Sequence, residues 1–411
     1  MDYRKKSVSV IGLGYIGLPS AALLASEGYM VKGMDINKHA VEIINKGEIH
    51  IMEPDLDAYV RSAVANGKLK AYSEVQAADI YIICVPTPFC ADSYPPKPNV
   101  DFVREAAKSI SHHLKDGDIV ILESTSPVGT TEMVKDLLEK NGVDTSSIFI
   151  AYCPERVLPG KIMVELVGNA RVIGGVNSQS TKIVSNFYRT FVNGEILETE
   201  ARTAEMCKLT ENSFRDVNIA FANELSVLCD NNGVDVWELI QLANHHPRVN
   251  ILQPGTGVGG HCVAVDPWFI VSQDPENSRI IKTAREINTS KPGWVVNQIK
   301  AAADSIGTKR VACLGLAFKP NIDDLRESPA IEVVESLIDQ GYKVSCVEPN
   351  ISDHKKYSLI NVNKAITEFD VIALLVKHKE FTSHIILSEL DSKGALDFCG
   401  VFWNNQRIGK V

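Results

Sequence analysis

At residues 7–17 the chain reads SVSVIGLGYIG, a short β-branched run that leads into a glycine-rich turn. Three glycines of this turn have the spacing Gly-x-Gly-x-x-Gly: Gly12, Gly14 and Gly17. An alanine-rich helix is predicted from Leu18, and the next predicted strand, residues 29–35, ends at Asp35. This order of strand, turn, helix and strand is typical of the first unit of a doubly wound α/β domain.

The glycine turn and the acidic residue after it predict a dinucleotide site. Glycines permit the tight turn and the approach of the backbone to a pyrophosphate, and the helix N-terminus directs its N–H groups at the phosphates. The residues expected to contact the cofactor here are Gly12, Gly14, Tyr15, Ile16 and Gly17. Asp35 would accept hydrogen bonds from the ribose hydroxyls and repel a 2′-phosphate. We therefore expect NAD rather than NADP, with a purely structural turn as the alternative.

The sequence after this unit continues the alternation of strands and helices. Three further apolar runs fit strands that a parallel sheet buries on both faces: residues 80–85, 119–123 and 148–152. Two predicted helices lie between them: residues 100–113 and 130–140. From residue 201 to about residue 231, apolar residues recur at helical spacing. Residues 236–243 and 280–305 are also predicted to be helical.

The last part of the chain resembles the first. Residues 309–315 are predicted to form a strand that enters Gly315, and a helix is predicted from Pro329. Residues 340–348 then match residues 27–35. The turn after Gly315 has no second or third glycine, so this second Rossmann-like domain is expected not to hold a dinucleotide. Chance similarity is the alternative.

These patterns predict an α/β protein with two Rossmann-like doubly wound domains joined by a central helical dimerisation region. The expected division is a NAD-binding domain at 1–195, a helical domain with catalytic residues and the dimer interface at 196–304, and a Rossmann-like domain at 305–411.

The composition narrows the class of protein. A net charge of −9 argues against a nucleic-acid partner, which needs a basic face. No apolar run reaches the roughly 18 residues of a membrane span, and the start MDYRKKS has no apolar leader. We therefore expect a cytoplasmic protein with no membrane partner. The nine cysteines are scattered and include no Cys-x-x-Cys pair, which favours reduced thiols and argues against a bound metal.

The segment GTGVGGHCVAVDP at residues 255–267 is the most unusual of the chain. Its glycines would let a substrate approach the thiol of Cys262, and the ionisable residues His261 and Asp266 are near it in sequence. A thiol beside a nicotinamide can trap an aldehyde as a thiohemiacetal, from which a second hydride can be lost. A small buried core residue is the alternative for any single cysteine.

One face of the long predicted helix carries polar residues three to four positions apart: Glu205, Lys208, Asn212 and Arg215. A solvated charged face is the simpler interpretation. The asparagine between two cations favours instead a site in which Lys208 and Asn212 stabilise an oxyanion and Arg215 contacts a phosphate.

Together these motifs resemble the UDP-glucose/GDP-mannose dehydrogenase family over essentially the whole chain. The motifs that carry the resemblance are Cys153-Pro154-Glu155-Arg156, Ala204-Glu205-x-x-Lys208-x-x-x-Asn212, Gly259-Gly260-His261-Cys262-x-x-x-Asp266-Pro267 and Gly315-Leu316-Ala317-Phe318-Lys319-Pro320. The family implies a Rossmann domain, a helical centre and a C-terminal domain that binds the UDP-sugar. The long apolar helix that begins near Ala201 has more apolar surface than one neighbouring domain could cover, which predicts a homodimer or a tetramer. The family implies that Arg248 reaches the active site of the neighbouring subunit.

The resemblance implies a two-step, four-electron oxidation of the C6 alcohol of a UDP-sugar by NAD. Cys262 would attack the intermediate aldehyde, and water would hydrolyse the resulting thioester. Lys208 would be the acid/base and oxyanion partner, with Asn212 beside it. Glu155 and Asp266 would position or activate water, together with Thr125.

The resemblance also assigns binding residues. Thr87 and Thr125 would line the nicotinamide side, and Arg326 would reach the cofactor. The residues implied to hold the UDP-sugar are Arg156, Val157, Lys208, Asn212, Arg215, His246, Arg248, Gly259, Lys319 and Arg407.

Two segments indicate which sugar is oxidised. Residues 246–250 and 264–269 look most like members of the family that oxidise UDP-N-acetyl-D-mannosamine to its uronate. Val265 stands where enzymes acting on UDP-glucose carry a lysine. Thr256 departs from the proline expected there, and this change should alter only the stiffness of the loop.

Three alternatives stay open from the sequence. The substrate could be UDP-N-acetyl-D-glucosamine, or the protein could be a two-electron NAD-dependent dehydrogenase of hydroxy acids, which would need no thiol. A non-enzymatic nucleotide-binding regulator is the third alternative. The joint presence of Cys262, Lys208 and Asn212 argues against a regulator.

Overall fold

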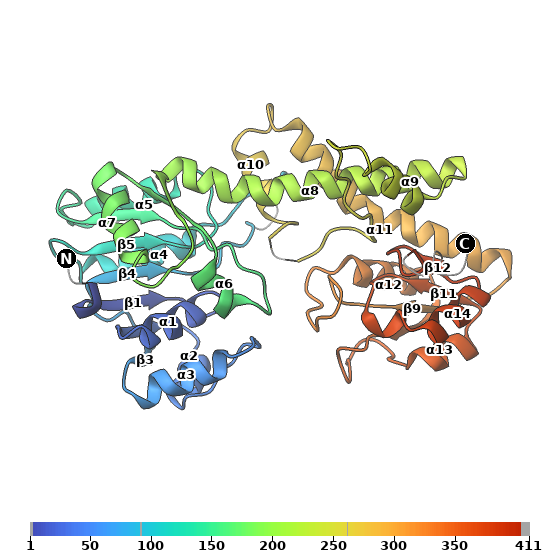
Figure 1. Ribbon diagram of the computed structural model, residues 1–411, viewed down its shortest axis with the longest axis horizontal. Coiled ribbons are helices and arrows are strands. Elements are labelled where there is room, and N and C mark those ends of the chain that lie inside the picture. Colours follow the sequence, from blue (N-terminus) through green and yellow to red (C-terminus); the bar gives the residue numbers. More distant parts are fainter. Residues whose placement is uncertain (1–2, 91–92, 261, 404–411) are drawn as a thin grey trace. The chain divides into compact units, whose positions relative to one another are not determined.

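A computed structural model describes residues 3–90, 93–260 and 262–403 of the chain. The chain divides into two compact units, Met1–Glu211 and Asn212–Val411. Helix α8, Ala201–Asn232, runs through this boundary and therefore belongs to both units (Figure 1).

The first unit is built on an eight-stranded sheet with the order β3-β2-β1-β4-β5-β6-β7-β8. Its strands are β1 (Ser7–Ile11), β2 (Met30–Met34), β3 (Leu69–Tyr72), β4 (Ile80–Ile83), β5 (Ile119–Leu122), β6 (Phe149–Tyr152), β7 (Arg171–Gly175) and β8 (Ile196–Glu200). The strands from β3 to β6 are parallel, and their order is that of a Rossmann sheet. Strand β7 is antiparallel to β6, and β8 is parallel to β7.

Helices cover both faces of this sheet because its central strands are apolar on both sides. They are α1 (Gly17–Ser26), α2 (Lys38–Asn45), α3 (Leu56–Ala65), α4 (Asp101–Ser111), α5 (Thr130–Lys140), α6 (Ile162–Gly168) and α7 (Ser178–Tyr188). Ile80 and Ile82 of β4 belong to one buried cluster with residues of α1 and α7. Tyr81 and Ile83 belong to a second cluster with residues of α4 and α5. Successive side chains of one strand thus pack against helices on opposite faces of the sheet.

The second unit contains the rest of α8 and a smaller parallel sheet with the order β10-β9-β11-β12. Its strands are β9 (Arg310–Leu314), β10 (Lys343–Val347), β11 (Val371–Leu374) and β12 (Leu396–Asp397). Its further helices are α9 (Val236–Ala243), α10 (Asp266–Gln273), α11 (Arg279–Ser305), α12 (Pro329–Asp339), α13 (Val362–Glu368) and α14 (His384–Ser392). Residues of α11 and α12 cover one face of this sheet, and residues of α13 and α14 cover the other.

The two sheets begin with the same backbone turn. Gly12 follows β1 with a φ of +90°, and Gly315 follows β9 with a φ of +93°. The amide of Gly12 donates to the carbonyl of Met34, and the amide of Gly315 donates to the carbonyl of Val347, both at 2.8 Å. The internal match seen in the sequence is therefore a match of structure.

In each turn an acidic side chain accepts hydrogen bonds from backbone amides. The two turns differ in the number of amides that donate to it. In the first turn Asp35 Oδ2 accepts from the amide of Leu13 at 2.9 Å. In the second turn Glu348 Oε2 accepts from the amides of Leu316 and Ala317, at 2.7 and 3.0 Å. The longer side chain of Glu348 occupies amides that a phosphate would need, which gives a physical reason why this turn should hold no dinucleotide.

The predicted fold class is confirmed, including the second parallel sheet. Three strands of the first unit were not predicted: β3, β7 and β8. Strand β8 has the sequence ILETE and only half-buried or exposed residues, so it lacks an apolar pattern. The antiparallel turn of the chain between β6 and β7 also had no sequence signal. None of the helices in the described ranges has the length and hydropathy needed to cross a bilayer.

Candidate active site

The glycine turn after β1 combines two tightly packed positions with one open position. A Cβ atom on Gly12 would lie 2.6 Å from the carbonyl oxygen of Cys84, and one on Gly17 would lie 1.7 Å from the carbonyl oxygen of Gly12. A Cβ on Gly14 would meet no atom of the described chain within 4 Å. The open position lies just before α1, where a pyrophosphate would face the helix N-terminus, and a side chain there would fill the space. The turn thus fits a dinucleotide.

Asp35 is held beside this turn by two backbone amides. Its Oδ2 atom accepts from Leu13 at 2.9 Å, and its Oδ1 atom accepts from Asn37 at 2.8 Å. Each carboxylate oxygen can accept a further hydrogen bond. The side chain is therefore fixed where ribose hydroxyls could donate to it.

The parallel strands bring several predicted site residues to one edge of the sheet. Thr87, Thr125 and Glu155 lie in the segments that follow β4, β5 and β6. The hydroxyl of Thr87 donates to the carbonyl oxygen of Thr125 at 2.7 Å, so these two residues are in direct contact. The carboxyl edge of parallel strands is where α/β folds bind ligands.

Glu155 is a buried carboxyl group with an unusual pKa. Only 9% of it is exposed, and its Oε1 atom accepts no hydrogen bond within the described part of the chain. Burial raises its pKa to about 7, although the cations Lys208 and Arg171 oppose the rise. Lys208 is itself buried on α8. A carboxyl group that titrates near neutral pH can both take and give a proton there.

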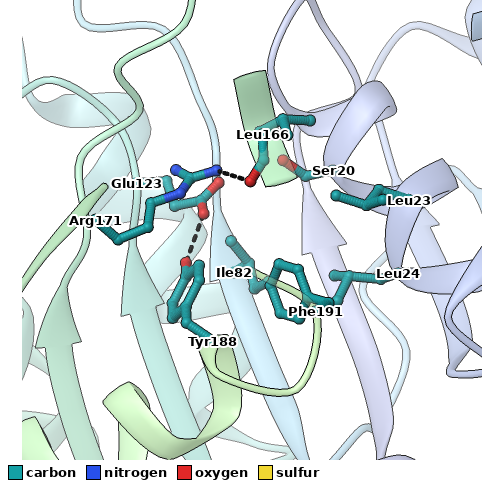
Figure 2. A pocket seen from close by; sticks show the side chains of 9 residues that line it. All are labelled: Ser20, Leu23, Leu24, Ile82, Glu123, Leu166, Arg171, Tyr188 and Phe191. Carbon is teal, nitrogen blue, oxygen red and sulfur yellow. Dashed lines mark hydrogen bonds between the residues drawn. The ribbon is translucent and has the colours of Figure 1, made fainter. Parts of the chain in front are cut away.

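A buried polar cluster of Glu123, Arg171 and Tyr188 was not predicted from the sequence (Figure 2). Arg171, at the start of β7, is 2% exposed and donates to the carbonyl oxygen of Leu166 at 3.2 Å. The hydroxyl of Tyr188 donates to Glu123 at 2.5 Å. An arginine that opens a strand normally suggests a solvated strand end, so the sequence carries no signal for this burial.

The polar face of α8 is not a uniformly solvated face. Glu205 is fully buried and accepts from the amides of Gly129 and Thr131, at 2.6 and 2.7 Å. It therefore satisfies the N-terminus of α5. Arg215 is exposed on the same helix.

In the second unit the structure brings Cys262, Asp266 and Asn212 together. The carbonyl oxygen of Cys262 accepts from the amides of Val265 and Asp266, at 3.0 and 2.8 Å. Asp266 is buried at the start of α10, and its Oδ2 atom accepts from Asn212 Nδ2 at 2.5 Å. Cys262 is exposed. All nine cysteines lie in the described ranges, and none of them forms a disulfide.

The glycines before Cys262 are packed against another segment of the second unit. A Cβ on Gly259 would lie 2.2 Å from the carbonyl oxygen of Glu327, and one on Gly260 would lie 2.9 Å from the ring of Phe318. Any side chain at these positions would force the loop away from that segment. Packing therefore gives a reason for these glycines besides access of a substrate.

Thr256 does more than alter the stiffness of the loop. Its buried hydroxyl donates to the carbonyl oxygen of Leu375, just after β11, at 2.6 Å. Proline has no donor for this bond. The expectation from the sequence was therefore incomplete, because it did not include a hydrogen-bonding role for the threonine.

Two of the predicted binding residues form ion pairs with other side chains of this chain, and a third packs against the core. The guanidinium of Arg156 pairs with Glu211, with Nη2 and Oε1 2.7 Å apart. Arg326 pairs with Asp324 through two hydrogen bonds of 2.8 and 2.7 Å. Val157 packs at the edge of the core of the first unit.

The remaining predicted residues lie at the surface or outside the described ranges. His246 and Arg248 are exposed in one turn, where His246 Nδ1 accepts from the amide of Arg248 at 3.3 Å. Lys319 is partly buried next to Phe318. His261 and Arg407 lie outside the described residues.

A Rossmann unit with an open anion cradle, and a second unit that presents a thiol on a glycine loop, place the chain among the dinucleotide-dependent dehydrogenases. Three domain models of one family match it in order. The NAD binding domain matches residues 6–192, the central domain matches residues 202–290 and the UDP binding domain matches residues 312–402. The chain belongs to the UDP-glucose/GDP-mannose dehydrogenase family. NAD as the cofactor is confirmed by the first of these matches.

Several known proteins are similar to this chain over almost its whole length. A UDP-N-acetyl-D-mannosamine dehydrogenase of Campylobacter jejuni is 53% identical over 95% of this chain and 98% of its own. An NDP-N-acetyl-D-galactosaminuronic acid dehydrogenase of Ralstonia nicotianae is 50% identical over 99% of both chains. The solved structure of the UDP-D-ManNAc dehydrogenase from Pyrococcus horikoshii is 38% identical and covers 98% of both chains with a TM-score of 0.88.

Proposed function

We propose that this chain oxidises the C6 alcohol of UDP-N-acetyl-D-mannosamine to a carboxylate in two steps. The observation that carries the proposal is the exposed Cys262 at the end of a glycine loop, tied through its backbone to Asp266 and through Asp266 to Asn212. An oxidation beyond the aldehyde gives such a thiol a use, because the thiol can hold the aldehyde as a thiohemiacetal. The similarity to the enzyme of Campylobacter jejuni supports the choice of sugar.

The proposed chemistry begins at the alcohol. The nicotinamide of NAD supplies the hydride acceptor for both oxidations. In the first oxidation the hydroxyl proton of C6 passes to a base as the aldehyde forms. The sulfur of Cys262 then bonds to C6 while the thiol proton passes to the aldehyde oxygen, which gives a thiohemiacetal. Loss of a hydride from that carbon and of the hydroxyl proton to a base leaves a thioester. Water adds to the thioester, the carbon–sulfur bond breaks, and the thiol is restored with the acid as product.

Four further residues are proposed to serve these steps. Lys208 would exchange the hydroxyl proton and, with Asn212, stabilise the oxyanion of the tetrahedral intermediates. Glu155 would take a proton from the attacking water, since its pKa of about 7 makes it a usable base at neutral pH. Asp266 would orient Asn212 and water.

The binding roles taken from the resemblance are part of the same proposal. The turn from Gly12 to Gly17, Asp35, Thr87, Thr125 and Arg326 would hold NAD. The residues proposed to hold the UDP-sugar, besides Lys208 and Asn212, are Arg156, Val157, Arg215, His246, Arg248, Gly259, Lys319 and Arg407. The division into domains at 1–195, 196–304 and 305–411 is proposed on the same basis.

An assay of turnover with counted products tests the function. The purified chain is given NAD and one of four UDP-sugars: the N-acetyl forms of mannosamine, glucosamine and galactosamine, or glucose. We expect the highest kcat/KM with UDP-N-acetyl-D-mannosamine, about two NADH per sugar, and a carboxylate by mass spectrometry. One NADH per sugar would remove the thioester step. A preference for another sugar would leave the chemistry standing and refute the substrate.

Asp35 is expected to set the choice between NAD and NADP. A 2′-phosphate would face its carboxylate, and such a pair of like charges costs several kcal/mol, so kcat/KM should be roughly 100-fold or more higher with NAD. The isosteric Asp35→Asn variant removes the charge and should lower this ratio at least about tenfold. Side-by-side kinetics measure both ratios. Equal use of the two cofactors by the unaltered chain would refute the role of Asp35.

We also propose that the chain forms a twofold dimer through α8. Phe214, Phe221 and Leu228 are seven residues apart on this helix and are 67%, 52% and 52% exposed. Residues seven apart share one face of a helix, so they form an apolar stripe that a second copy could cover. Arg248 is exposed as well, and it would act in the site of the partner.

Mixed dimers test the shared site. Cys262→Ser and Arg248→Ala, each nearly inactive alone, are co-expressed with different tags. If Arg248 acts across the interface, each mixed dimer has one site with both defects and one intact site. With random pairing, activity should return to about a quarter of the level of the unaltered chain. Mixed dimers that purify with both tags but stay inactive would show that Arg248 serves its own subunit.

A further inference from the structure

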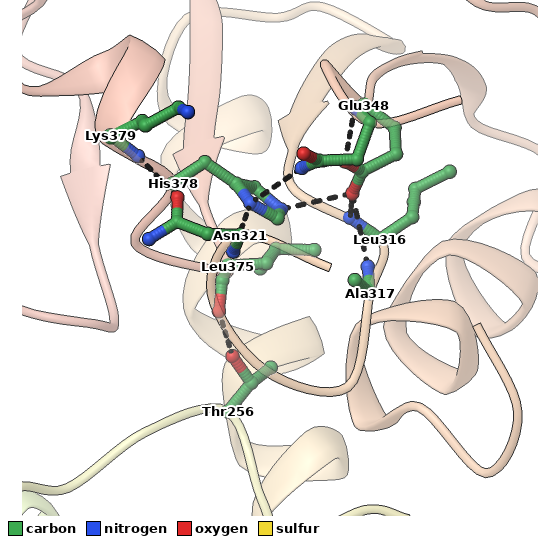
Figure 3. Close-up of polar contacts among 9 residues, drawn as sticks. Thr256, Leu316, Ala317, Asn321, Glu348, Leu375, His378 and Lys379 are labelled. Atoms are coloured by element: carbon green, nitrogen blue, oxygen red, sulfur yellow. Dashed lines mark hydrogen bonds and ion pairs between the residues drawn. The ribbon is translucent and has the colours of Figure 1, made fainter. Parts of the chain in front are cut away.

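A buried chain of hydrogen bonds in the second unit joins β10 to the segment after β11 (Figure 3). Glu348 Oε2 accepts from the amides of Leu316 and Ala317 and contacts His378 Nε2 at 3.0 Å. Burial opposes the charge on Glu348, but the hydrogen bonds from His378, Leu316 and Asn350 lower its pKa to about 2. The carboxylate is therefore ionised at neutral pH.

His378 is fully buried and is held from both sides of its ring. Its Nδ1 atom lies 3.0 Å from the amide nitrogen of Asn321 and 3.1 Å from Asn350 Nδ2. A backbone amide can only donate, so Nδ1 is an acceptor and the ring proton is on Nε2, directed at Glu348. The Oδ1 atom of Asn321 accepts in turn from the amide of Lys379 at 2.9 Å.

These bonds fix both ends of one turn, residues 316–321. Its first amides bind Glu348 and its last amide binds His378. Asn321 has a φ of +62°, in the left-handed region that asparagine tolerates better than most residues. The turn carries Phe318 and Lys319 between these two fixed ends.

Phe318 connects this turn to the loop that leads to Cys262. Its ring occupies the space where Gly260 would carry a side chain, and its Cβ atom would lie 3.0 Å from a Cβ on Gly259. The same loop is tied to the residue after β11 by the hydroxyl of Thr256, which donates to Leu375. The same set of contacts thus supports both the loop that leads to Cys262 and the turn that carries Lys319.

We propose that His378 is a positioning residue for the UDP-sugar site. With Glu348 it holds the turn 316–321, and this turn sets both Lys319 and, through Phe318, the approach to Cys262. The inference rests on the proposed function for the roles of Lys319 and Cys262. It assigns to His378 no contact with substrate or cofactor. If the Nδ1 acceptor is removed, the amide of Asn321 loses its partner and the turn can leave its position.

Three variants of His378, with UDP as the probe, test this role by calorimetry. His378→Phe removes both ring nitrogens and should weaken UDP binding roughly 10- to 100-fold, with NAD binding unchanged. His378→Asn keeps an acceptor near the place of Nδ1 and should bind UDP within about fivefold of the unaltered chain. His378→Gln reaches Glu348 but loses that acceptor, so it should bind as weakly as the phenylalanine variant.

His354→Phe is the matched control, since it makes the same change in the same unit. The ring of His354 stacks on Tyr357 outside the buried chain, and UDP binding should not change. Alkylation of Cys262 by iodoacetamide, followed by mass spectrometry, should change in rate at least about fivefold in His378→Phe and not in the control. If His378→Phe does not fold, the asparagine and glutamine variants decide.

Each outcome bears on the inference. A folded His378→Phe variant that binds UDP within about twofold of the unaltered chain overturns it. Equal UDP affinities of the asparagine and glutamine variants also overturn it, because they would show that affinity follows stability and not the Nδ1 bond. If the unaltered chain itself binds no UDP, the proposed function and this inference both fall. Loss of binding in the variants alone leaves the proposed function untouched.

Discussion

Cys262→Ser is expected to bind NAD and the UDP-sugar but to form the acid roughly 10³-fold more slowly, or not at all. A serine hydroxyl stays protonated at neutral pH, so it traps an aldehyde poorly, and the ester that it would form releases its product poorly. The measurement is steady-state NADH formation together with calorimetry for both ligands. Unchanged affinities would show that the loss lies in the chemistry.

Cys90→Ser is the control for this substitution, because Cys90 is also exposed and belongs to the first unit, whereas Cys262 belongs to the second. It should keep full activity. Acid formation by Cys262→Ser within about tenfold of the unaltered chain would remove Cys262 from the mechanism. Loss of activity in both variants would point to a general sensitivity to loss of thiols.

Glu155→Gln is expected to stop the reaction after the second oxidation. If Glu155 takes the proton from water, hydrolysis should slow about 10²- to 10⁴-fold, and the acyl group should stay on Cys262. Intact-protein mass spectrometry would then show the added mass of the substrate on the chain. Glu165→Gln is the control, since Glu165 is a nearby glutamate whose Oε2 atom accepts from the amide of Leu158 and from Asn169 Nδ2, at 2.8 and 3.4 Å.

The pH dependence of thioester hydrolysis is a second test of the role of Glu155. A base works when it is deprotonated, and the pKa of Glu155 is about 7, so the rate of hydrolysis should fall as the pH drops through 7. The glutamine variant has no proton to lose and should show no such fall in its residual rate. A pH profile that is the same in both chains would mean that another group activates the water.

The sequence predicted most of the fold where apolar periodicity and glycine turns agree. The helix predicted at 236–243 is observed as Val236–Ala243, and the helix predicted at 130–140 as Thr130–Lys140. Of the strands that were missed, β8 has the weakest apolar pattern, because it is a short edge strand that contains charged residues. Strand pairing in that part depends on contacts between distant residues, which periodicity does not report.

The residues of the candidate site also fall into two groups, those that the sequence predicted and those that it did not. The glycine turn, Asp35 and Cys262 could be found because each stands in a motif whose spacing is fixed by local geometry. The burial of Glu155 and the approach of Arg171 to it could not be found, since Arg171 reaches this place only after the chain has reversed into β7. The resemblance to a family named Glu155, but its raised pKa follows from the packed structure alone.

The two glycine turns differ in the source of their negative charge. In the first turn the negative charge would come from the diphosphate of bound NAD. The stability of that domain therefore depends on the concentration of NAD. In the second turn the anion is Glu348, which the chain carries as its own side chain. No dialysis or depletion can remove it. The turn of Lys319 therefore keeps these hydrogen bonds at any level of NAD, and a cell short of oxidised cofactor would still contain this domain with the turn in place.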